Sequence, residues 1–260
     1  MDGSAAPLLA VENVSLSFGG IVALDKVSFG VEEGQIVGLI GPNGAGKTTL
    51  FNCLTRLYRV DEGDIHFQGK SILKLPPHRI APLGIARTFQ NLALFDKMPV
   101  LENVMIGMHS RTRSDFLSNA LRLPWVGREE RAMMDRATEL ISYLGLEPEM
   151  HRRVTDLPFG TMKRVELARA LASSPKLLLL DEPASGLNHK EVEDLIGLIR
   201  EIRDQRKVTV LLVEHHMSLV MQVSDAVVAL NFGRMIASGT PKEMQEDENV
   251  IKAYLGDGSA

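Results

Sequence analysis

The residues best suited to chemistry lie in a glycine-rich stretch that reads Gly-Pro-Asn-Gly-Ala-Gly-Lys-Thr from Gly41 to Thr48. Glycines there allow positive φ angles, so successive backbone N–H groups can point into one concavity that suits phosphate oxygens. We expect Lys47 to reach the β- and γ-phosphates of a nucleotide and the Thr48 hydroxyl to hold magnesium. The stretch therefore predicts binding of ATP with Mg²⁺. The residues assigned to nucleotide binding in it are Gly41, Pro42, Asn43, Gly44, Ala45, Gly46, Lys47, Thr48 and Thr49.

A phosphate loop needs a strand before it and a helix after it. The run from Ile36 to Ile40 is short, apolar and rich in β-branched residues, which is typical of a parallel strand buried on both faces. Thr49 to Leu57 is predicted to form a helix whose positive N-terminus faces the anion. A glycine-rich turn that matches by chance is the alternative, and this context argues against it.

Two adjacent carboxylates, Asp181 and Glu182, end a run of four leucines. They should emerge at the carboxyl edge of a buried strand, where open α/β sheets bind ligands. We assign Asp181 to magnesium and Glu182 to the attacking water. His215 follows the next predicted strand at the same edge, where an imidazole can donate a hydrogen bond to a γ-phosphate. A solvated strand end and a structural histidine are the alternatives.

An aromatic residue, Phe18, precedes the turn Gly19-Gly20 near the start of the chain. Its π face could stack on a nucleotide base. Ordinary core packing explains the residue equally well, so the sequence leaves both interpretations open.

The elements that must position these residues indicate the α/β class. The strand, helix and strand around residues 176–213 form a βαβ crossover, which requires a parallel sheet. Strands are predicted at Leu8–Phe18, Val22–Val31, Ile36–Ile40, Ile65–Gln68, Ile85–Phe89, Lys176–Asp181, Val208–Val213 and Ala226–Leu230. Helices are predicted at Glu129–Leu144, Gly160–Ser173, Glu191–Arg206, Met217–Val223 and Val250–Leu255, and an irregular insertion at Ser110–Gly127.

Composition limits the partners and the compartment. The 260 residues carry a formal net charge of -4, which gives no basic footprint for a nucleic acid. The single Cys53 excludes an internal disulfide and is expected to be a small core residue. No apolar run approaches the ~18 residues that span a bilayer, and residues 1–7 lack the features of a signal peptide. We expect a cytoplasmic location and a membrane role only through a partner.

In their order and spacing, these motifs resemble those of ATP-binding cassette (ABC) ATPases. The segments that carry the resemblance are Gly41–Thr48, Gln90, Leu157–Leu171, Leu177–Glu182, Ser185–Asn188 and His215. The resemblance covers Leu8 to Leu255 and implies a phosphate-loop NTPase fold with a parallel RecA-like core sheet, an N-terminal antiparallel β lobe and an inserted α-helical lobe. It implies one domain over 8–255: β lobe and NTPase core at 8–91 and 173–240, helical lobe at 92–172, and a C-terminal helix at 241–255.

The resemblance also implies roles for single residues. Phe18 matches the adenine-stacking aromatic residue, and His215 matches the switch histidine. Gln90 matches the residue that links metal and attacking water to the membrane partner. Phe159, Gly160 and Thr161 lie in the signature motif, which meets the ATP held by the opposite subunit. These roles imply an ATPase that dimerises with a second cassette, identical or different, and serves transmembrane permease subunits, with a solute-binding protein reached through the permease.

Within the cassettes, Arg87-Thr88-Phe89-Gln90 and the ending Ala253-Tyr254-Leu255-Gly256 resemble the longer ATP-binding subunit of branched-chain amino acid importers. Cassettes for urea or for lipopolysaccharide export share several of these marks, so the solute stays open. The resemblance places the chain at the cytoplasmic face of the cell membrane as a peripheral protein. Leu92 to Val100, which includes Phe95, is expected to receive a permease helix, with core packing as the alternative.

Two positions depart from the cassette pattern. Pro158 stands where the signature usually has serine, and Thr161 stands where it usually has glutamine. The proline favours a second hypothesis, a low-turnover nucleotide-binding partner in a heterodimer, whereas Glu182 and His215 favour the enzyme. A third hypothesis, a cassette of DNA repair or translation, lacks the expected tandem cassettes and basic surface.

Overall fold

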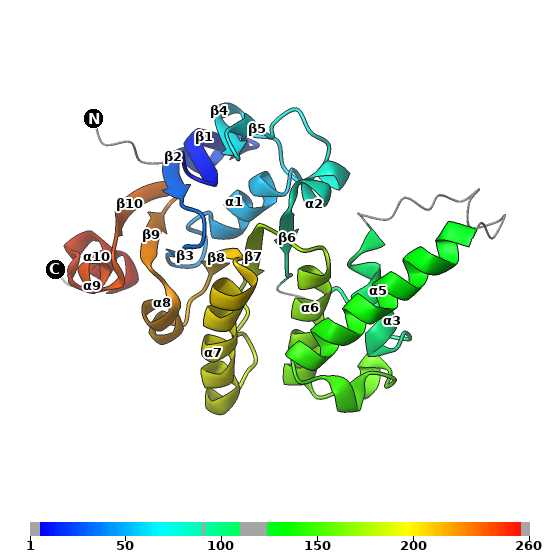
Figure 1. Cartoon of the computed structure of the whole chain (residues 1–260). Coiled ribbons are helices and arrows are strands. Elements are labelled where there is room, and N and C mark those ends of the chain that lie inside the picture. The colour runs from blue at the N-terminus through cyan, green and yellow to red at the C-terminus, as the bar shows by residue number, and fades with distance from the viewer. Residues whose placement is uncertain (1–5, 90–91, 110–123, 256–260) are drawn as a thin grey trace.

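A six-stranded sheet carries the strand that leads into the glycine-rich stretch (Figure 1). The computed structural model describes residues 6–89, 92–109 and 124–255. The strands are β1 (Leu9–Phe18), β2 (Ile21–Val31), β3 (Ile36–Ile40), β4 (Glu62–Phe67), β5 (Lys70–Ser71), β6 (Ile85–Arg87), β7 (Leu177–Asp181), β8 (Thr209–Val213), β9 (Ala226–Asn231) and β10 (Arg234–Gly239). The helices are α1 (Lys47–Leu54), α2 (Ile80–Leu83), α3 (Val100–Ile106), α5 (Pro124–Tyr143), α6 (Phe159–Ala172), α7 (His189–Arg206), α8 (Met217–Val223), α9 (Pro241–Glu246) and α10 (Glu248–Leu255).

The six-stranded sheet has the order β10-β9-β3-β8-β7-β6. Its neighbours pair in parallel except for β10, which runs antiparallel to β9 at one edge. Every residue of β3, β7 and β8 is buried, which explains their continuous apolar sequences. Because these three strands are parallel and adjacent, the residues that follow them meet at one edge of the sheet.

Two hydrophobic cores lie on the two faces of this sheet. One is shared with helix α1 and with a four-stranded antiparallel sheet of order β2-β1-β4-β5, and Phe51 and Leu24 are among its fully buried side chains. The other contains buried residues of α3, α5, α6, α7 and α8, such as Ile141 and Ile199. Helices α3, α5 and α6 form a group beyond β6 (Figure 1).

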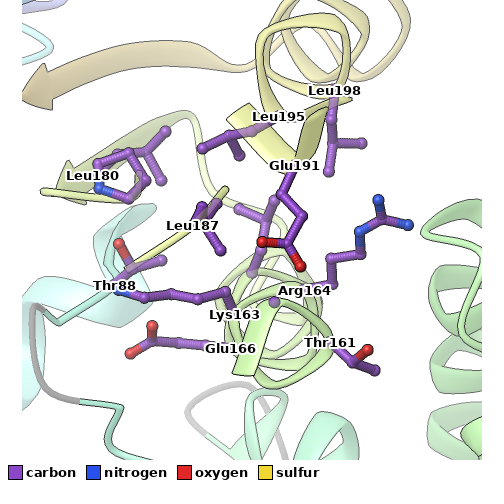
Figure 2. Close-up of a pocket in the computed structure, with 13 residues that line it drawn as sticks. Thr88, Thr161, Lys163, Arg164, Glu166, Leu180, Leu187, Glu191, Leu195 and Leu198 are labelled. Atoms are coloured by element: carbon purple, nitrogen blue, oxygen red, sulfur yellow. The ribbon is translucent and has the colours of Figure 1, made fainter. Parts of the chain in front are cut away.

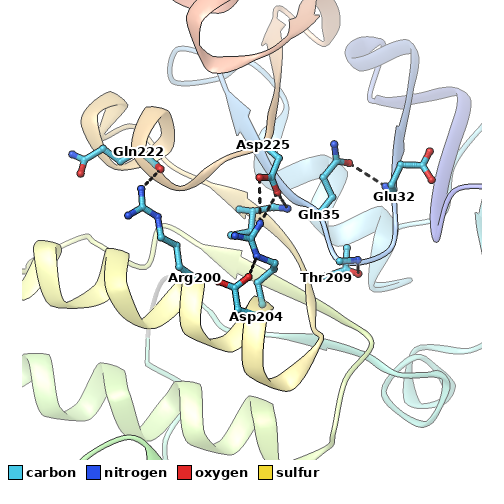
Figure 3. Close-up of polar contacts among 10 residues, drawn as sticks. Glu32, Gln35, Arg200, Asp204, Thr209, Gln222 and Asp225 are labelled. Atoms are coloured by element: carbon cyan, nitrogen blue, oxygen red, sulfur yellow. Dashed lines mark hydrogen bonds and ion pairs between the residues drawn. The ribbon is translucent and has the colours of Figure 1, made fainter.

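Polar contacts fix the opposite, amino-terminal end of the parallel strands (Figure 3). The Asp225 carboxylate accepts hydrogen bonds from the Ile36 N–H at 2.8 Å and from Arg203 Nη1 on α7 at 3.0 Å. The Thr209 hydroxyl accepts from the Gly34 N–H at 2.9 Å. These bonds tie β3, β8 and α7 together at the edge of the sheet opposite to Asp181 and Glu182.

Most predicted strands are confirmed to within two residues, but several helix predictions need correction. Helix α1 begins at Lys47 rather than at Thr49 because Gly46, with a φ of 102°, ends the loop directly before it. It stops at Leu54 rather than at Leu57, and Arg56 then has a φ of 61°. Helix α5 begins at Pro124, so the last residues of the expected irregular insertion are helical. Residues 110–123 of that insertion lie outside the described ranges.

The C-terminal region differs from the prediction in two ways. The single expected helix is two helices, α9 and α10, because Asp247 separates them and its carboxylate accepts hydrogen bonds from Asn249 N–H at 2.8 Å and Val250 N–H at 3.1 Å. Strand β10 was not predicted, since its residues are largely exposed and lack a period-two pattern. Within the described ranges, none of the helices combines the length and apolar character needed to cross a bilayer.

Candidate functional site

The glycine-rich stretch forms a loop between β3 and α1, as predicted. Two of its glycines are required by space. A Cβ atom at Gly41 would lie 2.2 Å from the Leu230 carbonyl oxygen, and one at Gly46 would lie 2.7 Å from the Ala23 carbonyl oxygen. Both also have φ angles in the range that favours glycine, 149° and 102°. The loop therefore presses against β9 and β2 with its backbone.

The Lys47 ammonium lies over the loop and is almost fully buried. Its Nζ donates hydrogen bonds to the carbonyl oxygens of Gly41 at 2.7 Å and Pro42 at 3.0 Å. Burial lowers the pKa of Lys47 below its ordinary value, while the charges of Glu182 and Asp181 oppose that shift. Both predicted carboxylates thus act on the loop lysine through space.

A cavity of about 180 Å³ lies against the loop. Its walls bring together Lys47, Thr48 and Glu182, three residues that the sequence assigned to one site. The remaining lining residues are Ala23, Asn43, Gly44, Ala45, Gly46 and Thr49. Phe18 does not line it: its ring is 45% exposed at the end of β1 and meets Tyr58 edge-on at 5.1 Å. Core packing is therefore wrong for Phe18, and base stacking remains a prediction.

Asp181 ends β7 and is buried, and it forms an ion pair that the sequence did not predict. Arg87 Nη2 donates to Asp181 Oδ2 at 2.7 Å, and Arg87 Nη1 donates to Asn52 Oδ1 on α1 at 2.7 Å. The Arg87 side chain is also buried, and its guanidinium lies 5.5 Å from the centroid of the Phe51 ring and 5.2 Å from that of the Phe89 ring. The arginine thus connects the candidate metal carboxylate to the helix that follows the phosphate loop.

Glu182 follows directly, with a left-handed φ of 47°. Its N–H donates to the Val213 carbonyl oxygen at 2.9 Å, so the bend is tied to the end of β8. The Nδ1 atom of His215 lies 3.8 Å from Glu182 Oε2. The structure therefore brings these two predicted residues together at the expected sheet edge, with the imidazole about half exposed.

Glu214, which sequence reasoning passed over, holds the backbone of this edge. The carboxylate is fully buried and accepts N–H groups of Ala184 at 2.7 Å, His215 at 3.0 Å and His216 at 3.2 Å. Ligand atoms of Glu214, His215 and His216 lie within 4.8 Å of one another, but these backbone bonds already account for the carboxylate. A structural role follows for Glu214.

Gln90 and Asn91 lie outside the described residues, but the segments on both sides of them contact helix α6. The buried Glu166 carboxylate accepts the Phe89 N–H at 3.0 Å, and Arg169 donates to the Ala93 carbonyl oxygen. Burial raises the pKa of Glu166 above its ordinary value. Its backbone hydrogen bonds and the charges of Lys163 and Arg169 lower the pKa, but burial has the larger effect. Helix α6 therefore holds the chain before and after Gln90.

The N-terminus of α6 carries the three predicted signature residues. Phe159 is 42% exposed and packs on Gly186, where a Cβ would lie 2.7 Å from its ring. A Cβ at Gly160 would lie 2.4 Å from Glu191 Oε1 on α7. Thr161 does not line the phosphate-loop cavity of the same chain. Phe159 and Gly160 do not line that cavity either.

A second cavity, of about 230 Å³, separates α6 from α7 (Figure 2). Glu191 points from α7 toward α6, and Lys163 and Glu166 extend from α6 below Leu180 and Leu187. Thr161 lines this cavity rather than that of the phosphate loop. Gly160 therefore meets Glu191 of α7, Phe159 meets Gly186 before α7, and open space lies beside these contacts.

A groove beside Phe89 contains exposed apolar surface between the helices and the sheets. Leu57 at 55% exposure and Phe89 at 38% are its most exposed large apolar residues. The other lining residues are Thr55, Pro77, Ile80, Ala81, Ile85, Ala86, Arg87, Ile106, Gly107, Arg169, Ala170 and Ser173. Residues 92–100 do not line it, although Phe95 is 47% exposed and so is not core.

Comparison with known proteins gives consistent matches over the whole fold. The ABC transporter family profile matches residues 24–185, and the profile of the branched-chain amino acid ATP-binding cassette transporter matches residues 234–260. The chain is 44% identical to the high-affinity branched-chain amino acid transport ATP-binding protein BraF of Pseudomonas aeruginosa, over 96% of this chain and 98% of that protein. It is 41% identical to the high-affinity branched-chain amino acid transport ATP-binding protein LivG of Escherichia coli K12, over 96% of this chain and 98% of that protein.

Solved structures agree with these matches. The ADP conformation of MJ1267, an ATP-binding cassette of an ABC transporter, superposes with a TM-score of 0.84 and 33% identity. The match covers 97% of this chain and 100% of the other.

Proposed function

The chain belongs to the ABC transporter family as a cassette ATPase, and from this we propose that it powers the import of branched-chain amino acids. The observation that carries the solute assignment is the match to BraF and LivG, which extends over 96% of the chain and includes the C-terminal region. Import places the protein on the cytoplasmic face of the membrane, attached through its permease.

We assign the hydrolytic roles to residues at the phosphate-loop edge of the sheet. Lys47 binds the β- and γ-phosphates, and Glu182 accepts the proton of the attacking water. His215, 3.8 Å from Glu182, donates a hydrogen bond to the γ-phosphate. Gln90 links the attacking water to the surface that contacts the permease. A base that stacks on Phe18 would explain why that ring is left exposed.

The oxygen donors of Thr48 and Asp181 fit Mg²⁺, which prefers hydroxyl and carboxylate ligands. Arg87 supports this assignment, because its ion pair with Asp181 fixes the orientation of the buried carboxylate. The cation would neutralise charge on the β- and γ-phosphates.

The active unit is a dimer of cassettes in which each signature segment meets the nucleotide of the other subunit. The separation of Thr161 from the phosphate-loop cavity of its own chain supports this arrangement. Phe159 and Gly160 stand at the N-terminus of α6, whose N–H groups and dipole favour an anion. The second subunit is identical or a related cassette.

The permease helix docks in the groove beside Phe89. The groove joins exposed apolar residues such as Leu57, which follows α1, to the helices, and Phe89 precedes Gln90 by one residue. An apolar docking surface beside Gln90 would couple permease movement to the water in the site.

Purification of the tagged chain with its membrane partners from its native host, followed by reconstitution in liposomes, tests the proposal. We expect two permease subunits, and ATP-dependent uptake of leucine, isoleucine or valine in the presence of the matching binding protein. Reconstituted complexes that transport urea instead, or copurification with a lipopolysaccharide-export permease, would overturn the solute assignment. Absence of ATP hydrolysis in the complete complex would favour the low-turnover hypothesis.

A further inference from the structure

The last helix of the chain reaches back to the phosphate loop through a tyrosine. The Tyr254 hydroxyl on α10 accepts a hydrogen bond from the Gly41 N–H at 2.8 Å. Gly41 is the first residue after β3, and the two partners are 213 residues apart in the sequence. Burial raises the pKa of the Tyr254 phenol, so the hydroxyl is neutral at physiological pH.

The peptide that contains Gly41 is constrained from several sides. Its Cα cannot carry a side chain, because a Cβ would lie 2.2 Å from the Leu230 carbonyl oxygen. Its carbonyl oxygen accepts from Lys47 Nζ at 2.7 Å, and its N–H is bound by Tyr254. The bond to Tyr254 holds the turn independently of Lys47, including when Lys47 Nζ leaves that carbonyl for a phosphate.

Contacts other than this hydroxyl also hold α10 in place. Val250 is buried in the core shared with Met244 of α9, and Asp247 caps the start of the helix. A cavity of about 400 Å³ separates the remaining face of α10 from the loop, with Pro42 and Asn43 on one wall and Lys252 and Ala253 on the other. The hydrogen bond is therefore a local link between two elements that are otherwise loosely packed against each other.

We propose that Tyr254 is a positioning residue for nucleotide binding, which keeps the turn at Gly41 and Pro42 in the shape that presents the phosphate loop. This inference rests on the proposed binding of ATP by the loop. It makes α10 a part of the nucleotide site, although no atom of Tyr254 needs to touch the nucleotide.

Tyr254→Phe removes only the hydroxyl and tests the proposal. We expect the dissociation constants of ATP and ADP to rise roughly three- to tenfold, the effect of one lost, partly buried hydrogen bond, while kcat at saturating ATP stays near that of the parent. Tyr143→Phe is the matched control, since that hydroxyl lies in α5 beside Arg206 of α7 and does not line the phosphate-loop cavity. Its nucleotide affinity should equal that of the parent.

Hydrogen exchange gives a second readout that a general loss of stability would not reproduce. In the ADP complex, Tyr254→Phe should speed exchange in the peptide that covers residues 36–41 and leave α5 unchanged. Equal nucleotide affinity and equal exchange in the parent and Tyr254→Phe would overturn the inference while leaving ATP binding intact. Failure of the parent protein to bind ATP would instead overturn the proposed function.

Discussion

Glu182 combines a strained backbone with a directed side chain. Its φ of 47° is left-handed, a conformation that costs a residue other than glycine about 1–3 kcal/mol. The bond from its N–H to the Val213 carbonyl oxygen and the nearby bond from Ala184 N–H to Glu214 hold the bend in place. The residue at this bend lines the phosphate-loop cavity, where we propose that its carboxylate acts on a water.

Glu182→Gln should keep ATP bound and lower turnover by at least about a hundredfold, because the amide preserves size but cannot accept a proton. Phosphate release measures turnover, and titration with a fluorescent ATP analogue measures binding. Glu193→Gln, the same change at an exposed carboxylate of α7, is the control and should leave both values unchanged. Parental turnover in Glu182→Gln would exclude Glu182 as the catalytic base.

Residues that belong to a local motif could be predicted from the sequence, and residues that act through a distant partner could not. Lys47 and Thr48 follow from one loop, and Glu182 follows from a strand end. The role of Arg87 as a link between Asp181 and α1 is visible only in the structure. There β6 lies beside β7, and Arg87 Nη1 donates to Asn52 Oδ1 at 2.7 Å. No spacing rule connects residues this far apart in the chain.

At the scale of elements, α6 joins the signature segment to the chain around Gln90. Its first turn lies against Gly186 and Glu191, its middle binds the Phe89 N–H through Glu166, and its last turns bind Ala93 through Arg169. A shift of this helix would therefore move both segments together. The sequence predicted the helix, but its contacts with Phe89 and Ala93 depend on packing between segments more than 70 residues apart.

Leu57→Asp should release the permease, because a carboxylate placed in an apolar docking groove loses hydration without gaining a partner. Leu57 is 55% exposed after the end of α1, so folding and nucleotide affinity should stay unchanged. Copurification from detergent measures attachment. Phe232→Asp, at an 84% exposed apolar residue in the turn between β9 and β10, is the control and should retain the permease.

Phe95→Asp distinguishes two surfaces that the permease could contact, the groove beside Phe89 and the segment of residues 92–100. Release by this variant, with Leu57→Asp still attached, would favour residues 92–100 as the docking segment and contradict the groove beside Phe89. Loss of nucleotide binding in Leu57→Asp would show that this residue supports the fold instead.

At the scale of the whole molecule, the proposed dimer would bring the signature residues to the nucleotide of the other subunit. Pro158 is the N-cap residue of α6, with φ of -57° and ψ of 150°, and it makes no side-chain cap bond. The Gly160 backbone can still present N–H groups to a γ-phosphate. A serine hydroxyl at position 158 would add a hydrogen bond to a charged group, worth about 1.5–3 kcal/mol, and would also cap the helix.

Pro158→Ser should therefore strengthen ATP-driven dimerisation at least about tenfold in the Glu182→Gln background, as measured by size-exclusion chromatography or sedimentation with ATP. Thermal unfolding without nucleotide reports the capping effect separately. Pro158→Asp is the matched control, since aspartate caps the helix as well as serine does but repels the phosphate of the other subunit. It should raise the unfolding temperature and weaken dimerisation. If Pro158→Ser in the Glu182→Gln background dimerises no better than Glu182→Gln alone, the proline allows the dimer to close fully and does not weaken dimerisation. If Pro158→Ser and Pro158→Asp strengthen dimerisation equally, helix capping rather than phosphate contact explains the gain.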